Sequence, residues 1–329
     1  MSRPRVFVTQ PIAESALARL RAVADVEVNP DSSRVLPKNE LIAAVKRADI
    51  LMSLLHDTVD RDVLTANPKL KAVSSMNITQ DRIDLAAATA LGIPVTNIPA
   101  IDTDATADIA FGLLLAVARN IVLGDKLFRQ GVYPGSQSNH LAGYAVSGKT
   151  LGLVGFGRIG QAVARRGRGF GMTIIYCDPR RLPAEEEATF AAGYRSFEQL
   201  LGEADFVSLH PQLTPETRHL MSDAQFALMK ETAFVINTAR GPVIDEAALV
   251  RALKAKQIAG AGLDVFEFEP QVSSELVAMP NVVLTPHLGS GVLELREGMA
   301  NVVVDNTIAL IEGRAPVSCL NPQVLKKLF

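Results

Sequence analysis

The sequence predicts an α/β protein built from two doubly wound parallel-sheet domains, and three observations support this class. Short β-branched runs alternate with longer segments of helical spacing along almost the whole chain, which is typical of parallel strands joined by helices. The 329 residues are enough for two domains of about 150 residues each. Hydrophobic residues make up 48% of the chain, so it can bury two cores and is not disordered.

The order of the elements follows from this alternation. In the first third of the chain, β-branched and apolar runs predict strands at residues 5–9, 26–28, 49–53, 71–74 and 94–96. The helical spacing of apolar residues predicts helices between these strands, for example at 12–22 and 41–47.

A long helical stretch follows, from residue 103 to about 131, and the acidic Asp104 in its first turn suits a helix N-terminus. A polar stretch rich in glycine, serine and asparagine then runs to residue 148. The second series of strands is predicted at 150–154, 173–176, 206–209, 233–236, 260–263 and 282–284. The last helix is predicted at 293–312.

The long helix and the last helix bracket the second series of strands, so we expect the chain to cross between domains at these two places. The prediction is a discontinuous first domain made of residues 1–99 and 289–329. A continuous second domain, residues 100–288, is inserted into it.

Charge and composition exclude several classes of partner. Lysine and arginine number 33 against 35 aspartates and glutamates, and the net charge of −2 predicts no nucleic-acid partner. The longest apolar runs, such as 111–118, fall far short of the ~20 residues of a membrane span, and no secretory signal opens the chain. Cys177 and Cys319 are too few for a disulfide framework and lie apart from histidine and acidic clusters. We therefore expect no metal site, no membrane partner and a cytoplasmic location.

A glycine-rich turn, GFGRIG at 155–160, follows the predicted strand at 150–154 and opens a helix at 159–169. Gly155 permits the tight turn, Gly157 lets the backbone approach a pyrophosphate, and Gly160 lets the helix pack on the strand. Such a triplet alone is weak, because a glycine-rich turn can lack a ligand. Its position between strand and helix predicts a dinucleotide site in a Rossmann-like domain, which assigns NAD(P) binding to residues 100–288.

The residues after the next strand bear on the choice of dinucleotide. Asp178 follows that strand, and a carboxylate there accepts hydrogen bonds from the ribose hydroxyls and repels a 2′-phosphate. Arg180 and Arg181 have the opposite effect, because guanidinium groups bind phosphate. NAD(H) is favoured on this basis, and NADP(H) stays open.

Three charged residues follow apolar strands in the second series. Arg240, Glu269 and His287 come after the strands at 233–236, 260–263 and 282–284. Each alone has an ordinary interpretation as a surface or packing residue. Open α/β sheets bind ligands at the carboxyl ends of their strands, so three such residues downstream of a dinucleotide motif predict a catalytic site. His56, His140, His210 and His219 are expected to be structural or surface residues.

Six motifs carry a family resemblance: GIPVTN at 92–97, DATADIAFGLLLAVAR at 104–119, GKTLGLVGFGRIGQ at 148–161, NTARGPVIDEAAL at 237–249, AGAGLDVFEFEP at 259–270 and LTPHLGS at 284–290. With them the chain resembles the D-isomer-specific 2-hydroxyacid dehydrogenase family along essentially its whole length, and most of all its glyoxylate/hydroxypyruvate reductase branch. The resemblance implies two Rossmann-like or flavodoxin-like domains with a cleft between them.

The resemblance also implies roles for single residues. Arg240 would bind the substrate carboxylate and polarise the carbonyl next to it. His287 would give a proton to the carbonyl oxygen, and Glu269 would pair with its imidazole and favour the protonated form. Thr238, Ala239 and Asp264 match positions at the nicotinamide end of the cofactor, while Arg158 and Ile159 match pyrophosphate donors. A homodimer is implied by the helix from Asp104 and the loop after residue 131.

One motif departs from the family. The family's substrate loop has glycines whose backbone N–H groups face the carboxylate, but here Asn77 and Thr79 replace them. A β-branched threonine tolerates a left-handed backbone poorly. The substrate-binding prediction therefore covers Asn77, Ile78 and Thr79 beside Arg240. The side chains of Asn77, Thr79 and Gln80 would add hydrogen bonds to a hydroxylated substrate.

The resulting prediction is an NAD(P)H-dependent reductase of small 2-keto acids, glyoxylate and hydroxypyruvate first. A 2-ketogluconate reductase and a D-lactate-type dehydrogenase are the alternatives within the enzyme class. A phosphoglycerate dehydrogenase is less favoured, because the substrate loop gains no lysine or arginine for a phosphate. A different class of function is an NAD(H)-sensing scaffold like the corepressors of this family.

Overall fold

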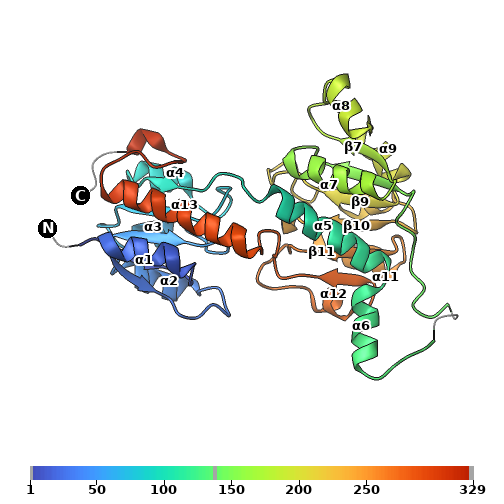
Figure 1. Cartoon of the computed structure of the whole chain (residues 1–329), viewed down its shortest axis with the longest axis horizontal. Helices are drawn as coiled ribbons and strands as arrows, with labels where there is room; N and C mark the ends of the chain where they lie inside the picture. The colour runs from blue at the N-terminus through green and yellow to red at the C-terminus, as the bar shows by residue number, and fades with distance from the viewer. Residues whose placement is uncertain (1–2, 136–138, 326–329) are drawn as a thin grey trace. The chain divides into compact units, whose positions relative to one another are not determined.

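The chain forms two compact units, each with its own parallel sheet (Figure 1). The computed structural model describes residues 3–135 and 139–325. The first unit is Met1–Ile101 with Val292–Phe329, and the second is Asp102–Gly291. The predicted α/β class with two parallel sheets is thus confirmed. The predicted cuts, after residues 99 and 288, lie within three residues of these boundaries.

The first unit has a five-stranded sheet in the order β2-β1-β3-β4-β5, with every pair parallel. Its strands are β1 (Arg5–Val8), β2 (Asp25–Val28), β3 (Ile50–Ser53), β4 (Ala72–Ser75) and β5 (Val95–Thr96). Its helices are α1 (Glu14–Val23), α2 (Lys38–Val45), α3 (Arg61–Thr65), α4 (Leu85–Ala90) and α13 (Leu293–Ile311).

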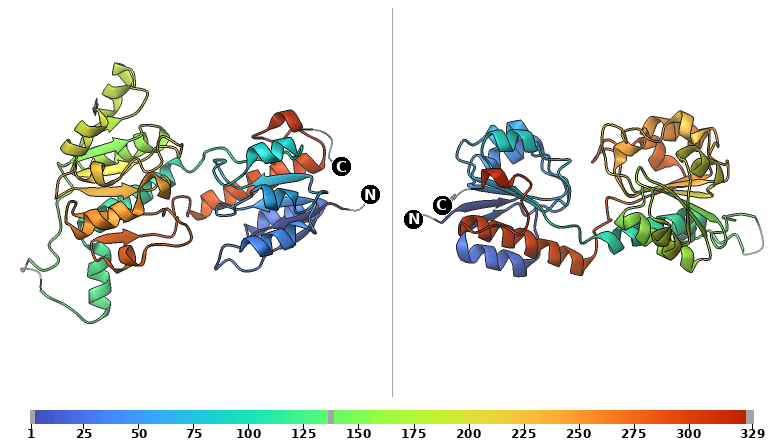
Figure 2. Two further views of the ribbon diagram at one scale, coloured as in Figure 1. Left: turned by 180° about the vertical axis from the view of Figure 1, so that it is seen from behind. Right: turned by 90° about the horizontal axis from the view of Figure 1, so that it is seen from above.

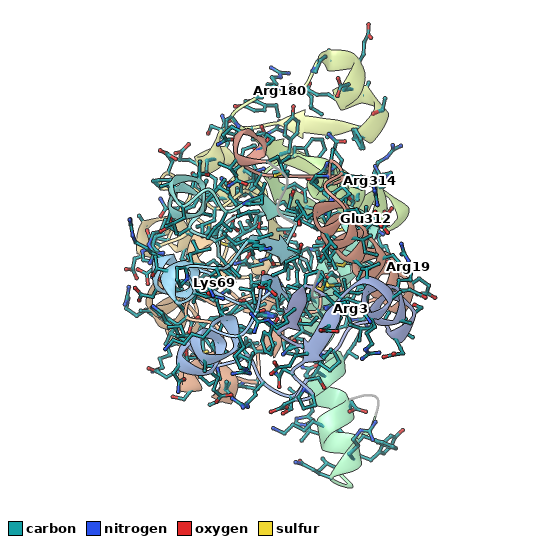
Figure 3. All side chains as sticks on the ribbon, turned by 90° about the vertical axis from the view of Figure 1, so that its left-hand side faces the viewer. Arg3, Arg19, Lys69, Arg180, Glu312 and Arg314 are labelled. Carbon is teal, nitrogen blue, oxygen red and sulfur yellow. The ribbon has the colours of Figure 1, made fainter. Side chains whose placement is uncertain are left out.

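Helices cover both faces of this sheet, as Figure 2 shows. On one face α1 and α13 pack side by side, and their buried residues share a core with Val6, Val8 and Met52 of the strands. Helices α2, α3 and α4 cover the other face. At the surface, the guanidinium of Arg19 on α1 hydrogen-bonds to Asn301 and Asp305 on α13; Figure 3 labels Arg19. Helix α13, from the second stretch of this unit, therefore completes the core that the first strands begin.

The second unit has a seven-stranded parallel sheet in the order β12-β11-β10-β9-β6-β7-β8. Its strands are β6 (Thr150–Val154), β7 (Thr173–Cys177), β8 (Ala192–Tyr194), β9 (Phe206–Leu209), β10 (Phe234–Asn237), β11 (Gly260–Leu263) and β12 (Val282–Leu284). Its helices are α5 (Thr103–Ala118), α6 (Ile121–Arg129), α7 (Arg158–Gly169), α8 (Ala184–Phe190), α9 (Phe197–Glu203), α10 (Asp223–Phe226), α11 (Glu246–Lys254) and α12 (Ser274–Ala278). Helices α5 and α7 pack in one core of this unit, and α9, α10 and α11 pack in the other.

The long helix predicted from residue 103 to 131 is wrong in one respect, because the structure breaks it in two. Asn120 adopts a left-handed backbone, with φ 53° and ψ 32°, between α5 and α6. Its side-chain amide donates to the carbonyls of Leu141 and Ala142, at 3.2 and 3.3 Å. The two helices meet at an angle of 63°. Asparagine tolerates this conformation better than most residues, and here its side chain also bonds to a distant segment of the chain, so the otherwise continuous helical pattern ends at Asn120.

Within the described part of the chain, no single helix is long and apolar enough to span a membrane, although the bent pair of α5 and α6 together passes the test of length and composition.

Both cysteines have free thiols. Burial, with the neighbouring Asp178 charge adding to it, raises the pKa of Cys177 to about 12. This thiol is therefore protonated at neutral pH and is a poor nucleophile. The cytoplasmic location stays a prediction.

Candidate active site

The three charged residues singled out in the sequence follow three neighbouring strands of one sheet. Arg240 comes after β10, Glu269 after β11 and His287 after β12, and these strands pair in parallel in that order. Their carboxyl ends therefore meet at one edge of the sheet, where open α/β sheets bind ligands.

His287 and Glu269 are in contact. The imidazole Nδ1 lies 3.3 Å from a Glu269 carboxylate oxygen, and the two side chains are 22% and 9% exposed. A carboxylate at Nδ1 orients the ring and leaves the other nitrogen, Nε2, available to exchange a proton with a substrate. The backbone of His287 is held at φ 55°, a conformation that is uncommon for a residue other than glycine and that often marks functional sites.

A buried carboxylate holds the loop that carries His287. Asp264 accepts hydrogen bonds from the Thr285 hydroxyl at 2.5 Å and from the backbone N–H groups of Leu288 and Gly289 at 2.7 and 2.8 Å. Its own carbonyl accepts the His287 N–H at 3.0 Å. Burial raises the pKa of the Asp264 carboxyl, and these hydrogen bonds act in the opposite direction. Asp264 therefore bonds to the Thr285 hydroxyl before the catalytic candidate and to backbone N–H groups at and after it, which holds the loop around His287.

Hydrogen bonds within the turn from Asn237 to Arg240 hold Arg240 in place. The Asn237 side chain accepts the Ala239 N–H and donates to the Arg240 carbonyl, both at 3.0 Å. The guanidinium Nη1 donates to the Ala239 carbonyl at 2.7 Å. Gly241 then packs so closely that a Cβ on it would lie 1.9 Å from the carbonyl carbon and oxygen of Phe266. Only glycine fits there, so the turn of Arg240 rests directly on the backbone that leads to Glu269.

The glycine-rich turn has the shape that its sequence predicts. Gly155 has φ +87°, and a Cβ there would lie 2.8 Å from the His210 carbonyl carbon. A Cβ on Gly160 would lie 2.4 Å from the Gly155 oxygen, whereas nothing lies within 4 Å of a Cβ on Gly157. Gly155 and Gly160 are thus required by packing, and Gly157 leaves space for a group to approach the N-terminus of α7. Because the first N–H groups of a helix lack internal acceptors, the turn fits a pyrophosphate through the N–H groups near Arg158 and Ile159.

Asp178 lies directly after β7, beside this turn. Its carboxylate accepts the Phe156 N–H at 2.8 Å and the Arg180 N–H at 2.9 Å. These bonds hold the carboxylate against the glycine-rich turn, where the sequence predicted a ribose partner.

The two arginines behind Asp178 differ from each other in the structure. Arg180 is exposed, as Figure 3 shows. Arg181 pairs with Glu187 of α8 through two bonds of 2.9 and 3.1 Å, and its guanidinium lies 5.3 Å from the Tyr194 ring centre. Glu187 also accepts the Tyr176 hydroxyl at 2.7 Å. The Arg181 charge is therefore engaged with its own unit.

Thr238 directly follows β10, and Ala239 comes between it and Arg240. The Thr238 hydroxyl is buried and has no hydrogen-bond partner among the described residues. Since buried polar groups are nearly always paired, this hydroxyl fits a site that a bound molecule completes.

The substrate loop predicted in the first unit does not need its missing glycines, because neither Asn77 nor Thr79 has a positive φ. The Ile98 N–H donates to the Asn77 carbonyl at 3.1 Å, and the Asn97 amide donates to the Ile78 carbonyl at 3.1 Å. Asn77 is 6% exposed, and its side-chain Nδ2 is buried without a partner in the described chain. The loop therefore presents a desolvated donor that the family pattern lacks.

Sequence reasoning gave no separate role to Asn237, Gly241 or Asn97, although all three stood inside quoted motifs. The sequence predicts that His210 and His219 are structural or surface residues. Desolvation lowers the pKa of the partly buried His210 to about 3, so this ring is neutral at physiological pH. His219 lies 2.6 Å from a Glu267 carboxylate oxygen, outside the group of Arg240, Glu269 and His287.

Comparisons with known proteins agree with this architecture. Residues 111–289 match the family described as "D-isomer specific 2-hydroxyacid dehydrogenase, NAD binding domain". A glyoxylate reductase of Thermococcus litoralis is 47% identical over 327 residues, which cover 98% of each chain. A crystal structure from Thermus thermophilus is 43% identical, with a TM-score of 0.86 over 96% of this chain and 99% of that one. An NADPH-dependent glyoxylate/hydroxypyruvate reductase of Sinorhizobium meliloti, solved with NADP and malonate, is 30% identical, with a TM-score of 0.80 over 99% of both chains.

Proposed function

Because the chain belongs to the D-isomer-specific 2-hydroxyacid dehydrogenase family, we propose that it reduces small 2-keto acids, glyoxylate and hydroxypyruvate first, with a nicotinamide cofactor. The observation that carries the proposal is the set of side chains at the ends of β10, β11 and β12. One sheet edge holds a guanidinium and a paired carboxylate and imidazole, and the same sheet carries the glycine-rich turn.

The proposed chemistry divides between the cofactor and the protein. The turn at Gly155 to Gly160, with Asp178, Thr238, Ala239 and Asp264 around it, is the proposed binding site for a nicotinamide cofactor, which would supply the hydride when bound. Arg240 binds the substrate carboxylate, for which its planar fork is suited. His287 donates a proton from Nε2 to the oxygen of the former carbonyl, and Glu269 holds the ring through Nδ1.

Alanine variants of His287 and Arg240 should separate these two roles. In His287→Ala we expect kcat for glyoxylate to fall by about 10²- to 10⁴-fold, because the proton donor acts in the chemical step. NADH affinity, measured by fluorescence titration, should stay nearly unchanged. In Arg240→Ala, oxalate binding measured by calorimetry should weaken by about 10- to 100-fold, since a charge-assisted hydrogen bond is lost.

Arg251→Ala is the matched control, because Arg251 is exposed and pairs with the exposed Asp223. A His287→Ala enzyme that keeps kcat but loses cofactor would contradict the role of His287, and unchanged oxalate affinity would contradict that of Arg240. Wild-type protein that reduces no 2-keto acid in a panel assayed with NADH and NADPH would favour the scaffold class instead. The same panel separates glyoxylate and hydroxypyruvate from 2-ketogluconate and pyruvate.

For the cofactor we propose a preference for NAD(H), with NADP(H) used less well. Asp178 supports this preference, because its carboxylate is fixed at the glycine-rich turn and repels a 2′-phosphate. The pairing of Arg181 with Glu187 supports it as well, because it keeps one of the two nearby guanidinium groups engaged.

Glu187→Ala should therefore raise kcat/KM for NADPH relative to NADH by about tenfold, the gain from one released guanidinium on a phosphate. The ratio is measured from initial rates with saturating glyoxylate. The double variant Glu187→Ala, Arg181→Ala is the control and should lose the gain. An unchanged ratio in the single variant would show that Arg181 plays no part in cofactor choice.

We propose that Asn77, Ile78 and Thr79 contribute to substrate binding. The buried, unpartnered Nδ2 of Asn77 supports this, because a substrate oxygen would satisfy it.

In the double variant Asn77→Gly, Thr79→Gly, kcat/KM for hydroxypyruvate should fall by about 2- to 10-fold more than for glyoxylate, because hydroxypyruvate alone has the extra hydroxyl. Steady-state assays with both substrates measure the ratio. An unchanged ratio would refute a role of these side chains in choosing the substrate.

We also propose a homodimer that forms through α6 and the segment after it. No residue of α6 is buried, although Ile121, Val122 and Phe128 lie on it, and all three are exposed together with Tyr133. The Phe128 and Tyr133 rings lie 6.3 Å apart, and exposed aromatic and aliphatic side chains that gather on one surface are typical of a subunit interface.

Sedimentation equilibrium should give a mass near twice the 35.2 kDa of one chain. Phe128→Glu should shift the protein towards monomer, because it buries a charge in the interface. Lys126→Glu, a second charge change on the same helix, controls for altered charge alone. A monomeric wild-type protein would refute the dimer.

A further inference from the structure

Two buried carboxylates outside the proposed chemistry bind each other's backbone. Glu246 is the first residue of α11, and Glu267 lies in the loop after β11. The Glu246 N–H donates to the Glu267 carboxylate at 3.2 Å, and the Glu267 N–H donates to the Glu246 carboxylate at 3.1 Å. The exposed fractions are 7% for Glu246 and 5% for the Glu267 side chain. We call this reciprocal pair the carboxylate brace.

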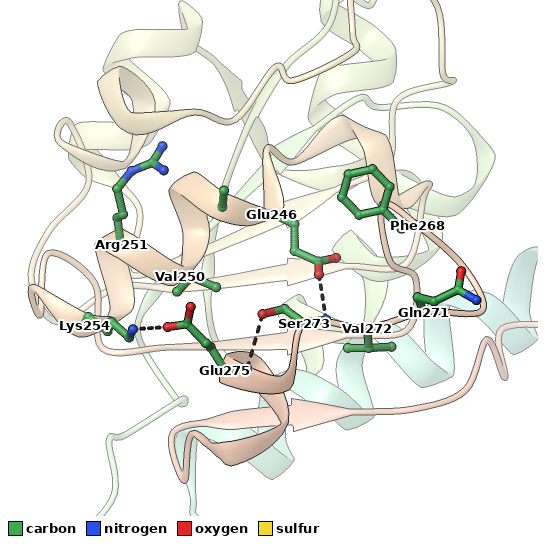
Figure 4. Close-up of a pocket in the computed structure, with 10 residues that line it drawn as sticks. Glu246, Val250, Arg251, Lys254, Phe268, Gln271, Val272, Ser273 and Glu275 are labelled. Atoms are coloured by element: carbon green, nitrogen blue, oxygen red, sulfur yellow. Dashed lines mark hydrogen bonds and ion pairs between the residues drawn. The ribbon is translucent and has the colours of Figure 1, made fainter.

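The brace is attached to the loop at a second point. Figure 4 shows the Glu246 carboxylate at the wall of a cavity of about 580 Å³, bonded to the backbone N–H of Ser273. That bond measures 2.9 Å. The loop from Glu267 to Ser273 is thus fixed at both ends to the start of α11, and Glu269 lies inside it.

Burying two carboxylates is costly unless charged or hydrogen-bonding partners compensate. Glu267 receives two such partners on its other oxygen, the His219 Nε2 at 2.6 Å and the Arg218 Nη2 at 3.2 Å. The segment that carries these residues also runs beside the turn after Arg240. The His219 N–H donates to the Pro242 carbonyl at 2.8 Å, and the Met221 N–H to that of Val243 at 3.0 Å.

Glu267 therefore joins the two segments that carry the catalytic candidates. Its own peptide is where Gly241 packs, since a Cβ on Gly241 would lie 2.5 Å from the Glu267 nitrogen. One residue earlier, the Phe266 N–H donates to the Glu269 carboxylate at 3.1 Å. A shift of the Glu267 backbone would therefore move two groups together: the peptide on which Gly241 packs, and the Phe266 N–H that donates to Glu269.

We propose that Glu267 is a positioning residue, which sets the distance between Arg240 and the pair of Glu269 and His287 through the brace and through His219. The inference rests on the proposed function, since it assigns a role in that reaction. Misplacement of reacting groups by about 1 Å can cost 10²-fold in rate, so a small shift of this backbone is enough to be measured.

The test compares Glu267→Ala and Glu267→Gln with a matched control, Glu275→Ala. Glu275 is a half-exposed carboxylate on the neighbouring α12 and pairs with Lys254, as Figure 4 shows. In Glu267→Ala, kcat/KM for glyoxylate should fall by about 10- to 100-fold while the Kd for NADH stays within about twofold. Glu267→Gln should recover part of the loss, because its carbonyl oxygen still accepts the Glu246 N–H. The control should stay within about twofold of wild type.

Hydrogen exchange measured by mass spectrometry supplies a readout that does not need turnover. Glu267→Gln keeps an acceptor for the Glu246 N–H, and His219→Ala keeps the brace but loses the contact between His219 and Glu267. In both variants, the backbone amides of peptides over residues 264–269 and 240–246 should exchange faster than in wild type, while those over β6 do not change. If Glu267→Ala does not fold, the amide exchange and the kcat/KM of Glu267→Gln and His219→Ala test the proposed role of Glu267. A wild-type kcat/KM in both Glu267→Gln and His219→Ala would overturn the proposal. A loss of activity that is fully explained by weaker NADH binding would overturn it as well. Wild-type protein without turnover would instead reject the proposed function, while the exchange result still tests the brace.

Discussion

A close approach of two backbone segments in the second unit sets the geometry of the candidate site. Gly241 lies against the peptide that joins Phe266 to Glu267, and no room is left there for a Cβ. This contact ties the turn after β10 to the loop after β11, although Glu267 lies 26 positions after Gly241 in the sequence. The placement of Arg240 relative to the loop that carries Glu269 therefore depends on packed backbone, which varies less than the position of a long side chain.

Carboxylates do most of the positioning around this contact. Asp264 holds the His287 loop by three hydrogen bonds, and Glu246 and Glu267 hold the Glu269 loop through reciprocal bonds to the backbone. Such groups are costly to bury, as the raised pKa of Asp264 indicates, and the hydrogen bonds that offset the cost have demanding geometry. Glu269 differs from them because it faces an imidazole at the end of a strand. Closely spaced acidic residues of one motif thus serve different purposes.

Patterns of local periodicity were enough to predict both parallel sheets, the glycine-rich turn and the strand-end positions of Arg240, Glu269 and His287, because each depends on neighbouring residues or on the polarity of parallel strands. The break at Asn120 was missed, since it depends on carbonyls about 20 residues away. Strand β8 was missed because Ala-Gly-Tyr is short and has no β-branched residue. The engagement of Arg181 by Glu187 and the brace at Glu267 depend on tertiary contacts that no spacing rule contains. The burial of the Asn77 amide could not be predicted either, because it depends on the segments that pack around the residue in the folded chain.

The division of the first unit into two stretches of chain has a consequence for synthesis on the ribosome. Met299, Ala300, Val303 and Val304 of α13 fill the core over β1, β3 and β4, yet they are made about 220 to 290 residues after those strands. At roughly 5–20 residues per second, the nascent sheet waits about 10–60 s for the helix that covers it. The second unit is contiguous and completes its own core during that interval. The inserted unit is thus the first for which all core residues have been synthesised, while the first sheet still lacks the helix α13 that covers part of one apolar face.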